Sequence, residues 1–238
     1  MRPDLSTRAV DARELMDAPD ADERMLGRTY DRFRIVNALV SRPGGVYRRD
    51  VRPRARHGRV RILDVGAGGG DLCRDLARRL HRDGLSADIT ALDADERAIR
   101  WASDHDGGAG IRYRCAFSHE LVAEGAQFDV VLSNHVLHHL SDAELPRMLQ
   151  DTRALVGDTG VVVHHDIARA DAAYALYRAG TAPFSGTVLA GTFIREDGLI
   201  SIRRSYTAQE LAAVVPQGWT VRTRMPFRLE LRWNPTTP

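Results

Sequence analysis

Histidines gather at the ends of two apolar stretches of this chain, which holds nine histidines in all. The five that gather are His135, His138, His139, His164 and His165. Imidazole is the side chain best suited to proton transfer near neutral pH, so either group could supply a general base. We select His135 and His165 as candidate bases, and Asp166 as the carboxylate that would orient the imidazole.

The same histidines could bind a metal ion instead. His138, His139, His164 and His165 would then have to point toward one position. Neighbouring residues of a strand point to opposite faces of the sheet, so two adjacent pairs do not converge easily. The sequence therefore predicts no metal site.

Residues 60–72 hold a second candidate site. An apolar, β-prone run over residues 60–65 leads into glycines at positions 66, 68, 69 and 70. A helical pattern follows, with leucines one turn apart at Leu72, Leu76 and Leu80. A strand, a tight glycine turn and a helix open the nucleotide-binding α/β domains. Glycine lets the backbone turn sharply and lets a ligand approach it closely.

Two acids distinguish this turn from a dinucleotide site. The G-x-G-x-x-G fingerprint needs glycine at position 71, which is Asp71, and Asp64 precedes the glycines. Carboxylates here suit a cation and would repel a diphosphate at the helix N-terminus. The pattern D-x-G-x-G-x-G resembles motif I of class I S-adenosylmethionine-dependent methyltransferases, whose cofactor carries sulfonium and ammonium cations. The resemblance implies cofactor contacts at Asp64, Gly66, Ala67, Gly68, Gly69 and Asp71.

The second predicted strand, residues 86–92, leads directly into Asp93-Ala94-Asp95. A carboxylate about 20–30 residues past the glycines can accept hydrogen bonds from both ribose hydroxyls of a nucleoside. Asp93 is our candidate for this role, with Ala94 beside it. Asp95 is better placed to cap the helix expected over residues 96–103.

The third predicted strand, residues 111–117, departs from the methyltransferase pattern. Members of this class often place an acid at its end, where it meets the adenine amino group. Here Cys115 and Ala116 occupy the matching positions. We therefore expect backbone groups of these two residues, and stacking on Phe117, to contact the adenine.

Residues 128–140 resemble motif IV of the small-molecule methyltransferases, which begins F-D-x-[VI] and ends in a histidine pair. Ligands of doubly wound sheets bind at the carboxyl ends of the strands where the strand order reverses. Asn134 and His135 are therefore expected to face the methyl region of the cofactor. His138 and His139 resemble the family's pair that packs the helix start. The N-P-P-[YF] sequence of the amino-nucleobase methylases is absent, which counts against methylation of nucleobases or glutamine.

These elements define the expected fold class. We predict an α/β fold with a doubly wound, mostly parallel seven-stranded sheet, as in the Rossmann-like methyltransferases. A turn at residues 157–160 precedes a buried strand over residues 161–166. Alternating apolar and polar residues over 219–233 predict an antiparallel C-terminal hairpin.

Residues 1–58 are expected to form a helical N-terminal lid. Tyr30-Asp31, Asn37 and Tyr47-Arg48 resemble the N-terminal segment of the quinone-biosynthesis C-methyltransferases. The resemblance implies that Tyr30 lies over the cofactor, and simple packing of an amphipathic helix on the sheet edge is the alternative. Residues 1–20 are interpreted as a loose polar lead-in.

Residues 59–238 are expected to form the methyltransferase domain itself. Within it, residues 167–206 are predicted to be an insertion that caps an apolar substrate pocket. We expect a loop or short helices over residues 180–191 of this insertion. The tetrapeptide SIRR at residues 201–204 resembles family members encoded near bacterial polyketide synthases.

Composition limits the classes of protein. The net charge is only +2 and every basic residue is arginine, which argues against a dedicated nucleic-acid binder. The arginine-rich residues 52–61 are interpreted as a solvated linker, and an RNA-modifying enzyme is the rival reading. No apolar run of ~18 residues predicts a membrane span, and no apolar signal segment opens the chain. With only two cysteines, a cytoplasmic protein is expected. We further expect a monomer or homodimer.

The sequence as a whole predicts methyl transfer from S-adenosylmethionine to a small molecule, with S-adenosylhomocysteine as the by-product. The favoured reaction is O-methylation of a phenolic or polyketide-type natural product, helped by a histidine base. C-methylation of a quinol or polyketide ring and N-methylation of a small amine stay open. A nonenzymatic nucleoside-binding module is the alternative from a different class.

Overall fold

A computed structural model describes residues 3–40 and 44–235, except the side chains of residues 34, 35, 37–40 and 158. The described strands form one seven-stranded sheet in the order β3-β2-β1-β4-β5-β7-β6. Their bounds are β1 Val60–Val65, β2 Ala87–Asp93, β3 Arg112–Cys115, β4 Phe128–Asn134, β5 Val156–Ile167, β6 Thr220–Arg224 and β7 Arg228–Trp233. Strand β7 is antiparallel to both of its neighbours, and the other pairs are parallel. The predicted doubly wound sheet and terminal hairpin are confirmed.

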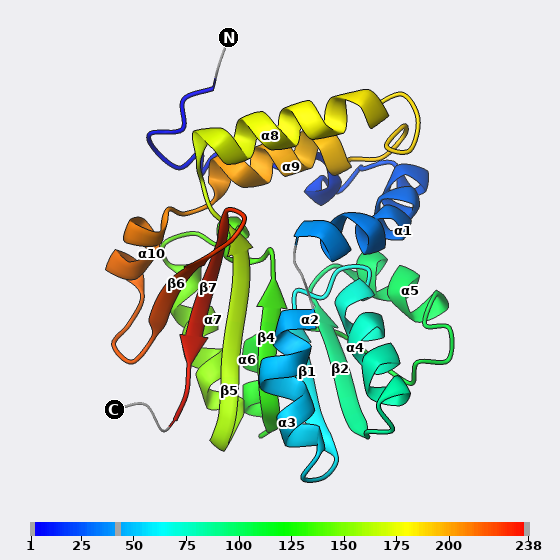
Figure 1. The fold of residues 1–238 in the computed structure, drawn as a ribbon, viewed down its shortest axis with the longest axis vertical. Helices are drawn as coiled ribbons and strands as arrows, with labels where there is room; N and C mark the ends of the chain where they lie inside the picture. Colours follow the sequence, from blue (N-terminus) through cyan, green and yellow to red (C-terminus); the bar gives the residue numbers. More distant parts are fainter. Residues whose placement is uncertain (1–2, 41–43, 236–238) are drawn as a thin grey trace.

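Helices connect the strands and cover both faces of the sheet (Figure 1). The longer ones are α1 Glu23–Val40, α4 Asp71–Arg82, α5 Glu96–Asp104, α6 Ser118–Ala123, α7 Glu144–Ala154, α8 Asp171–Thr181, α9 Ile194–Arg204 and α10 Ala208–Val214. The short turns are η1 Leu15–Asp17, α2 Gly44–Val46, η2 Tyr47–Val51, α3 Arg52–Ala55, η3 Leu137–His139 and η4 Ala182–Phe184.

The valine run of β5 shows how the sheet builds two cores. Val161, Val162 and Val163 are fully buried. Because successive residues of a strand face opposite sides, Val162 packs in the core that holds residues of α6, α7 and α10. Val161 and Val163 pack in the core that holds residues of η2, α3 and α4. A strand covered on both faces therefore has the continuous apolar sequence that predicted its burial.

The strand order reverses between β1 and β4, which pair next to each other at the centre of the sheet. Helices α8 and α9 lie side by side across the carboxyl ends of the parallel strands, with η1 and part of α1 beside them (Figure 1). The carboxyl edge of the sheet is thus enclosed by segments from both ends of the chain.

The prediction of a loose lead-in is wrong for the described part of residues 1–20. Glu14 is only 5% exposed. The Ala9 N–H donates to the Arg203 carbonyl over 3.0 Å, and the Arg169 guanidinium donates to the Leu5 carbonyl over 2.9 Å. The polar composition of this segment did not predict that it docks on the rest of the fold, because the contacts named here are made by its backbone groups.

Two smaller expectations are also corrected. Residues 157–160 lie inside β5 beside an irregularity in its pairing with β4, and do not form a separate turn. Residues 52–61 are no linker, since α3 begins this stretch and β1 ends it. The loop or short helices expected over residues 180–191 are found as the end of α8, η4 and turns, whereas α9, which follows, was not predicted. Within the described residues, no helix is both long and apolar enough to cross a membrane. The side chain of Asn37 lies outside the described residues.

Candidate active site

A cavity of about 640 Å³ opens at the carboxyl edge of the sheet. It receives most of the residues that the sequence assigned to the cofactor: Tyr30, Asp64, Gly66, Ala67, Gly68, Gly69, Asp71, Asp93, Ala94, Ala116, Phe117, Asn134 and His135. Cys115 is the exception, and its backbone contact with the adenine stays a prediction. It lies outside the cavity lining and is exposed, with its Sγ 3.7 Å from the Ala94 carbonyl oxygen.

Two glycines of the turn after β1, Gly66 and Gly69, leave no room for a side chain. Gly66 has φ +69°, and a Cβ there would lie 2.4 Å from Val136 Cγ2. A Cβ on Gly69 would lie 2.9 Å from Tyr30 Cβ. The turn is thus closed on one side by the loop after β4 and on another by α1. Tyr30 reaches the cavity by packing on this turn.

Asp93 at the end of β2 joins two backbone segments. Its Oδ2 accepts a hydrogen bond from the Gly68 N–H over 2.7 Å, and its Oδ1 accepts one from the Asp95 N–H over 2.9 Å. Burial raises the pKa of Asp93, and these two hydrogen bonds oppose the rise. Each carboxylate oxygen can still accept a further hydrogen bond. Asp95 caps α5 as expected, since its side chain accepts from the Arg97 N–H.

Asp64 is a buried acid at the cavity wall, 2% exposed. Its Oδ2 lies 3.4 Å from the Cys73 thiol, and its Oδ1 has no hydrogen-bond partner among the described residues. Burial raises the pKa of Asp64 to about 8, and the charges of Asp71 and Asp93 add to the rise. A bound cation would satisfy the Oδ1 atom, so the residue fits the ammonium group of S-adenosylmethionine.

His135 follows β4 in a left-handed backbone conformation with φ 60°. A residue with a side chain seldom adopts this conformation, and such residues cluster at functional sites. Its N–H donates to the His165 carbonyl over 2.9 Å, which holds the backbone in place. The His135 ring lines the cavity, and its Nδ1 lies 3.6 Å from Asp166 Oδ1.

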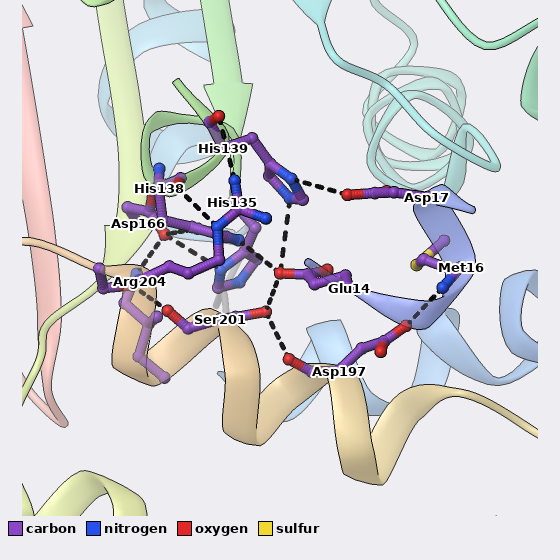
Figure 2. A network of polar contacts seen from close by, with 12 residues as sticks. Glu14, Met16, Asp17, His135, His138, His139, Asp166, Asp197, Ser201 and Arg204 are labelled. Carbon is purple, nitrogen blue, oxygen red and sulfur yellow. Dashed lines mark hydrogen bonds and ion pairs between the residues drawn. The ribbon is translucent and has the colours of Figure 1, made fainter. Parts of the chain in front are cut away.

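His138 lies between two carboxylates (Figure 2). Its Nδ1 is 2.8 Å from Asp166 Oδ1, and its Nε2 is 3.2 Å from Glu14 Oε1. Burial alone would lower the pKa of His138, but the two carboxylates outweigh it and raise the pKa to about 10. Both ring nitrogens of His138 are engaged by carboxylates, so His138 is not selected as the base.

Comparison with known proteins agrees with this geometry. Residues 62–160 match the family described as "Methyltransferase domain", the part that runs from β1 into β5. The chain carries a class I S-adenosylmethionine-dependent methyltransferase domain.

Curated relatives share part of this methyltransferase domain. The ubiquinone biosynthesis O-methyltransferase of Caulobacter sp. (strain K31) is 35% identical over 137 residues, which cover 56% of this chain and 51% of that protein. Its namesake from Sinorhizobium medicae (strain WSM419) is 39% identical over 87 residues, 36% of this chain and 33% of that protein. The chain therefore matches about a third to a half of the length of these relatives.

Solved structures share the fold of the methyltransferase domain. The plantazolicin methyltransferase BpumL, in complex with a monoazolic desmethylPZN analog and SAH, covers 91% of this chain and 91% of its own, with a TM-score of 0.62 and 16% identity. A second structure is titled "Conversion of a Disulfide Bond into a Thioacetal Group during Echinomycin Biosynthesis". The match covers 75% of this chain and 77% of that one, with a TM-score of 0.52 and 18% identity.

His165 lies on the other side of the sheet of the methyltransferase domain. It does not line the cavity, and its Nε2 is 3.3 Å from Glu230 Oε2 of β7. Burial lowers the pKa of His165. Its neighbour Asp166 points to the opposite face, toward His138, as strand alternation requires. His165 is therefore not retained as a base.

The four-histidine metal arrangement does not form either. His164 is buried between the hydroxyls of Ser133 and Thr152, at 2.8 and 3.3 Å, and stacks on Trp219. Burial lowers the pKa of His164 to about 3. It is a packed core residue that contributes nothing to the cavity.

Sequence reasoning missed Glu14, which lines the cavity and contacts a residue 124 positions later. It also missed Asp17, Asp197 and Ser201, which line the same part of the cavity. No local pattern marks these residues, because their role depends on contacts between opposite ends of the chain. The SIRR resemblance included Ser201 without predicting the helix that carries it.

Proposed function

We propose that this protein transfers a methyl group from S-adenosylmethionine to a hydroxyl group of a small phenolic or polyketide-type acceptor, with His135 as the general base. The observation that carries the proposal is the position of His135. Its ring lines the same cavity as the glycine turn, and its Nδ1 lies 3.6 Å from the buried carboxylate of Asp166. A base in the cavity and an acid behind it are the parts that such a reaction needs.

The cofactor would be held by residues that line the cavity. Asp64 would pair with its ammonium group, Asp93 would accept from the ribose hydroxyls, and Ala116 and Phe117 would contact the adenine. The glycine turn leaves backbone N–H and carbonyl groups open to close approach. When bound, S-adenosylmethionine supplies an electrophilic methyl group, so the protein has mainly to align the acceptor and exclude water.

Asp166 would act as a positioning residue for His135. Burial would raise its pKa, but His138 and His135 outweigh this and hold the pKa of Asp166 below its usual range. The carboxylate therefore stays charged and can stabilise the imidazolium that forms when His135 takes the acceptor proton. The relatives named O-methyltransferases support a hydroxyl acceptor.

The predicted lid and cap are part of the proposal. Met16, Tyr30 and Phe33 from residues 1–58 line the cavity, as do Tyr177 and Ile194 from residues 167–206. These side chains suit an apolar or aromatic acceptor. Residues 59–238 would form the catalytic domain beneath them. The cytoplasmic location and the monomeric or homodimeric state stay predictions.

The test is turnover of a panel of phenolic and polyketide-type acceptors with labelled S-adenosylmethionine. We expect His135→Gln to lower kcat about 100- to 1,000-fold with an unchanged melting temperature, since a positioned base contributes rate enhancements of this order. His57→Gln is the matched control, because His57 is exposed and outside the cavity lining. If the His135→Gln variant kept the full turnover rate, His135 would not be the general base.

The product separates the remaining alternatives. Nuclear magnetic resonance of the methylated product distinguishes a methyl group on oxygen from one on carbon or nitrogen. A methyl group on a ring carbon would replace the proposal by C-methylation. Binding of S-adenosylhomocysteine without turnover of any acceptor would favour a nonenzymatic nucleoside-binding module.

A further inference from the structure

Glu14, His138 and His139 form a compact group on the cavity wall (Figure 2). Each offers one ligand atom, and the three atoms lie within 4.8 Å of one another. Glu14 Oε1 is 3.2 Å from His138 Nε2 and 3.7 Å from His139 Nε2. One carboxylate oxygen and two imidazole nitrogens therefore meet at a single place.

The other nitrogen of each imidazole faces a second carboxylate. His138 Nδ1 lies 2.8 Å from Asp166 Oδ1, and His139 Nδ1 lies 3.2 Å from Asp17 Oδ2. In metal sites a carboxylate or carbonyl commonly holds the nitrogen of a histidine that does not bind the metal, which fixes the ring and its tautomer. Both rings here have this support, and both direct Nε2 toward Glu14.

Helix α9 holds the group from one side (Figure 2). Ser201 Oγ donates to Glu14 Oε1 over 2.7 Å, and the Asp197 carboxylate accepts from the two backbone N–H groups that follow Glu14, at 2.7 and 3.0 Å. The Arg204 guanidinium donates to the carbonyls of both histidines, at 3.2 and 3.1 Å. Helix α9 thus holds the Glu14 side chain and the backbone of both histidines, and the group is organised before any ligand arrives.

We propose that Glu14, His138 and His139 bind one divalent ion of a first-row transition metal, such as Zn²⁺, Fe²⁺ or Co²⁺. Two imidazoles and one carboxylate are a known ligand set for these ions. Metal–ligand bonds of about 2.0–2.1 Å place neighbouring ligand atoms about 3.0–3.4 Å apart, so the observed 3.2 and 3.7 Å need little closure. All three residues line the cavity, so an ion held there would be accessible from it.

The proposed ligands differ from the four histidines whose divergence led the sequence to predict no metal site. That prediction considered His138, His139, His164 and His165 together, and it failed to include Glu14. The structure separates the two pairs, so the proposed ligands combine one pair with an acid from the N-terminal segment. The test of this site measures bound metal and not turnover, so its outcome can be told apart from that of the proposed methyl transfer.

The experiment is metal titration of the chelator-treated, full-length protein. Co²⁺ is followed by visible absorption and Zn²⁺ by calorimetry. We expect one ion per chain, with affinity lowered about 100-fold or more in Glu14→Gln and in His139→Ala, because each loses a ligand. Asp17→Asn keeps all three ligands and is expected to lower affinity about 10- to 100-fold. His57→Ala, which removes an exposed histidine, should bind like the unaltered protein.

Two results would overturn the proposal. The first is that the unaltered protein binds no ion, which would mean that Glu14, His138 and His139 form a hydrogen-bonded network alone. The other is equal binding by Glu14→Gln and the unaltered protein, which would place the ion elsewhere. Glu14→Gln keeps the size and a hydrogen-bond acceptor for Ser201, so it tests the site even if His139→Ala fails to fold. Circular dichroism verifies folding of each variant.

Discussion

The Gly68 N–H donates a hydrogen bond to Asp93 Oδ2 over 2.7 Å, which ties the glycine turn after β1 to the acid at the end of β2. The two strands pair in parallel, with Val65 opposite Leu92, so the turn and the acid reach the same edge of the sheet. The residue proposed to bind the ribose therefore also fixes the turn that would contact the nucleoside.

Asp93→Ala is expected to weaken binding of S-adenosylhomocysteine about 100-fold or more. The change removes the proposed ribose contacts and the bond to Gly68, and hydrogen bonds to charged groups contribute about 1.5–3 kcal/mol each. Calorimetric titration measures the affinity. Asp88→Ala is the control, because Asp88 lies at the other end of β2 in an exposed ion pair with Arg59. Equal affinity of the two variants would contradict the role of Asp93.

Gly66→Ala is expected to abolish cofactor binding and to destabilise the fold, because its Cβ would lie 2.4 Å from Val136 Cγ2. Gly84→Ala separates the effect of the left-handed backbone from the effect of the steric clash. Gly84 has a similar φ of +66°, but a Cβ there meets nothing within 4 Å. We expect Gly84→Ala to cost about 1–2 kcal/mol from the left-handed backbone alone and to leave binding intact. Thermal melts and S-adenosylhomocysteine titrations compare the two, and similar behaviour would count against close approach at Gly66.

Binding of S-adenosylhomocysteine is expected to depend on pH through Asp64. Burial raises the pKa of Asp64 to about 8, so the free protein carries it mostly protonated below that pH. A bound ammonium group needs the charged form, so affinity should rise up to about tenfold per pH unit between about pH 6 and 8 and then level off. Asp64→Asn should bind weakly with no such slope. If Asp64→Asn retained the full pH dependence of the affinity, the titrating proton would belong to another group.

Glu230→Gln is expected to lower the free energy of unfolding by about 2–3 kcal/mol at neutral pH. Glu230 is buried and contacts Arg49 at 2.8 Å, Arg224 at 3.0 Å and His165 at 3.3 Å. Burial would raise its pKa, but these partners outweigh it and hold the pKa of Glu230 well below its usual range. Its contribution is therefore present above the unfolded-state pKa of about 4.5 and is lost as the pH falls further.

Urea unfolding at several pH values checks this expectation. The difference between Glu230→Gln and the unaltered protein should shrink on acidification. Glu96→Gln is the control, because Glu96 is exposed on α5 in a surface ion pair, and we expect a change within about 0.5 kcal/mol. An equal loss of stability in both variants would mean that the buried contacts of Glu230 add nothing.

Local sequence determined the parts of this protein whose signals lie within one strand and its neighbouring turn. The strand, glycine turn and helix at residues 60–72, the acid Asp93 and the terminal hairpin were all predicted correctly as structural features. These features are encoded by backbone requirements and short-range periodicity, which do not depend on distant residues. The sheet order followed from them by resemblance to a known family.

Only the tertiary structure decided which polar groups meet in the cavity. Glu14 contacts His138, which lies 124 positions later in the sequence, and no residue pattern near Glu14 predicts that contact. The side of the sheet that His165 faces was likewise open in the sequence, because two neighbouring candidates must point in opposite directions and only packing selects which one enters the site. Sequence supplied the acids, glycines and histidines, whereas the docking of the N-terminal segment and α9 onto the strand ends decided their partners.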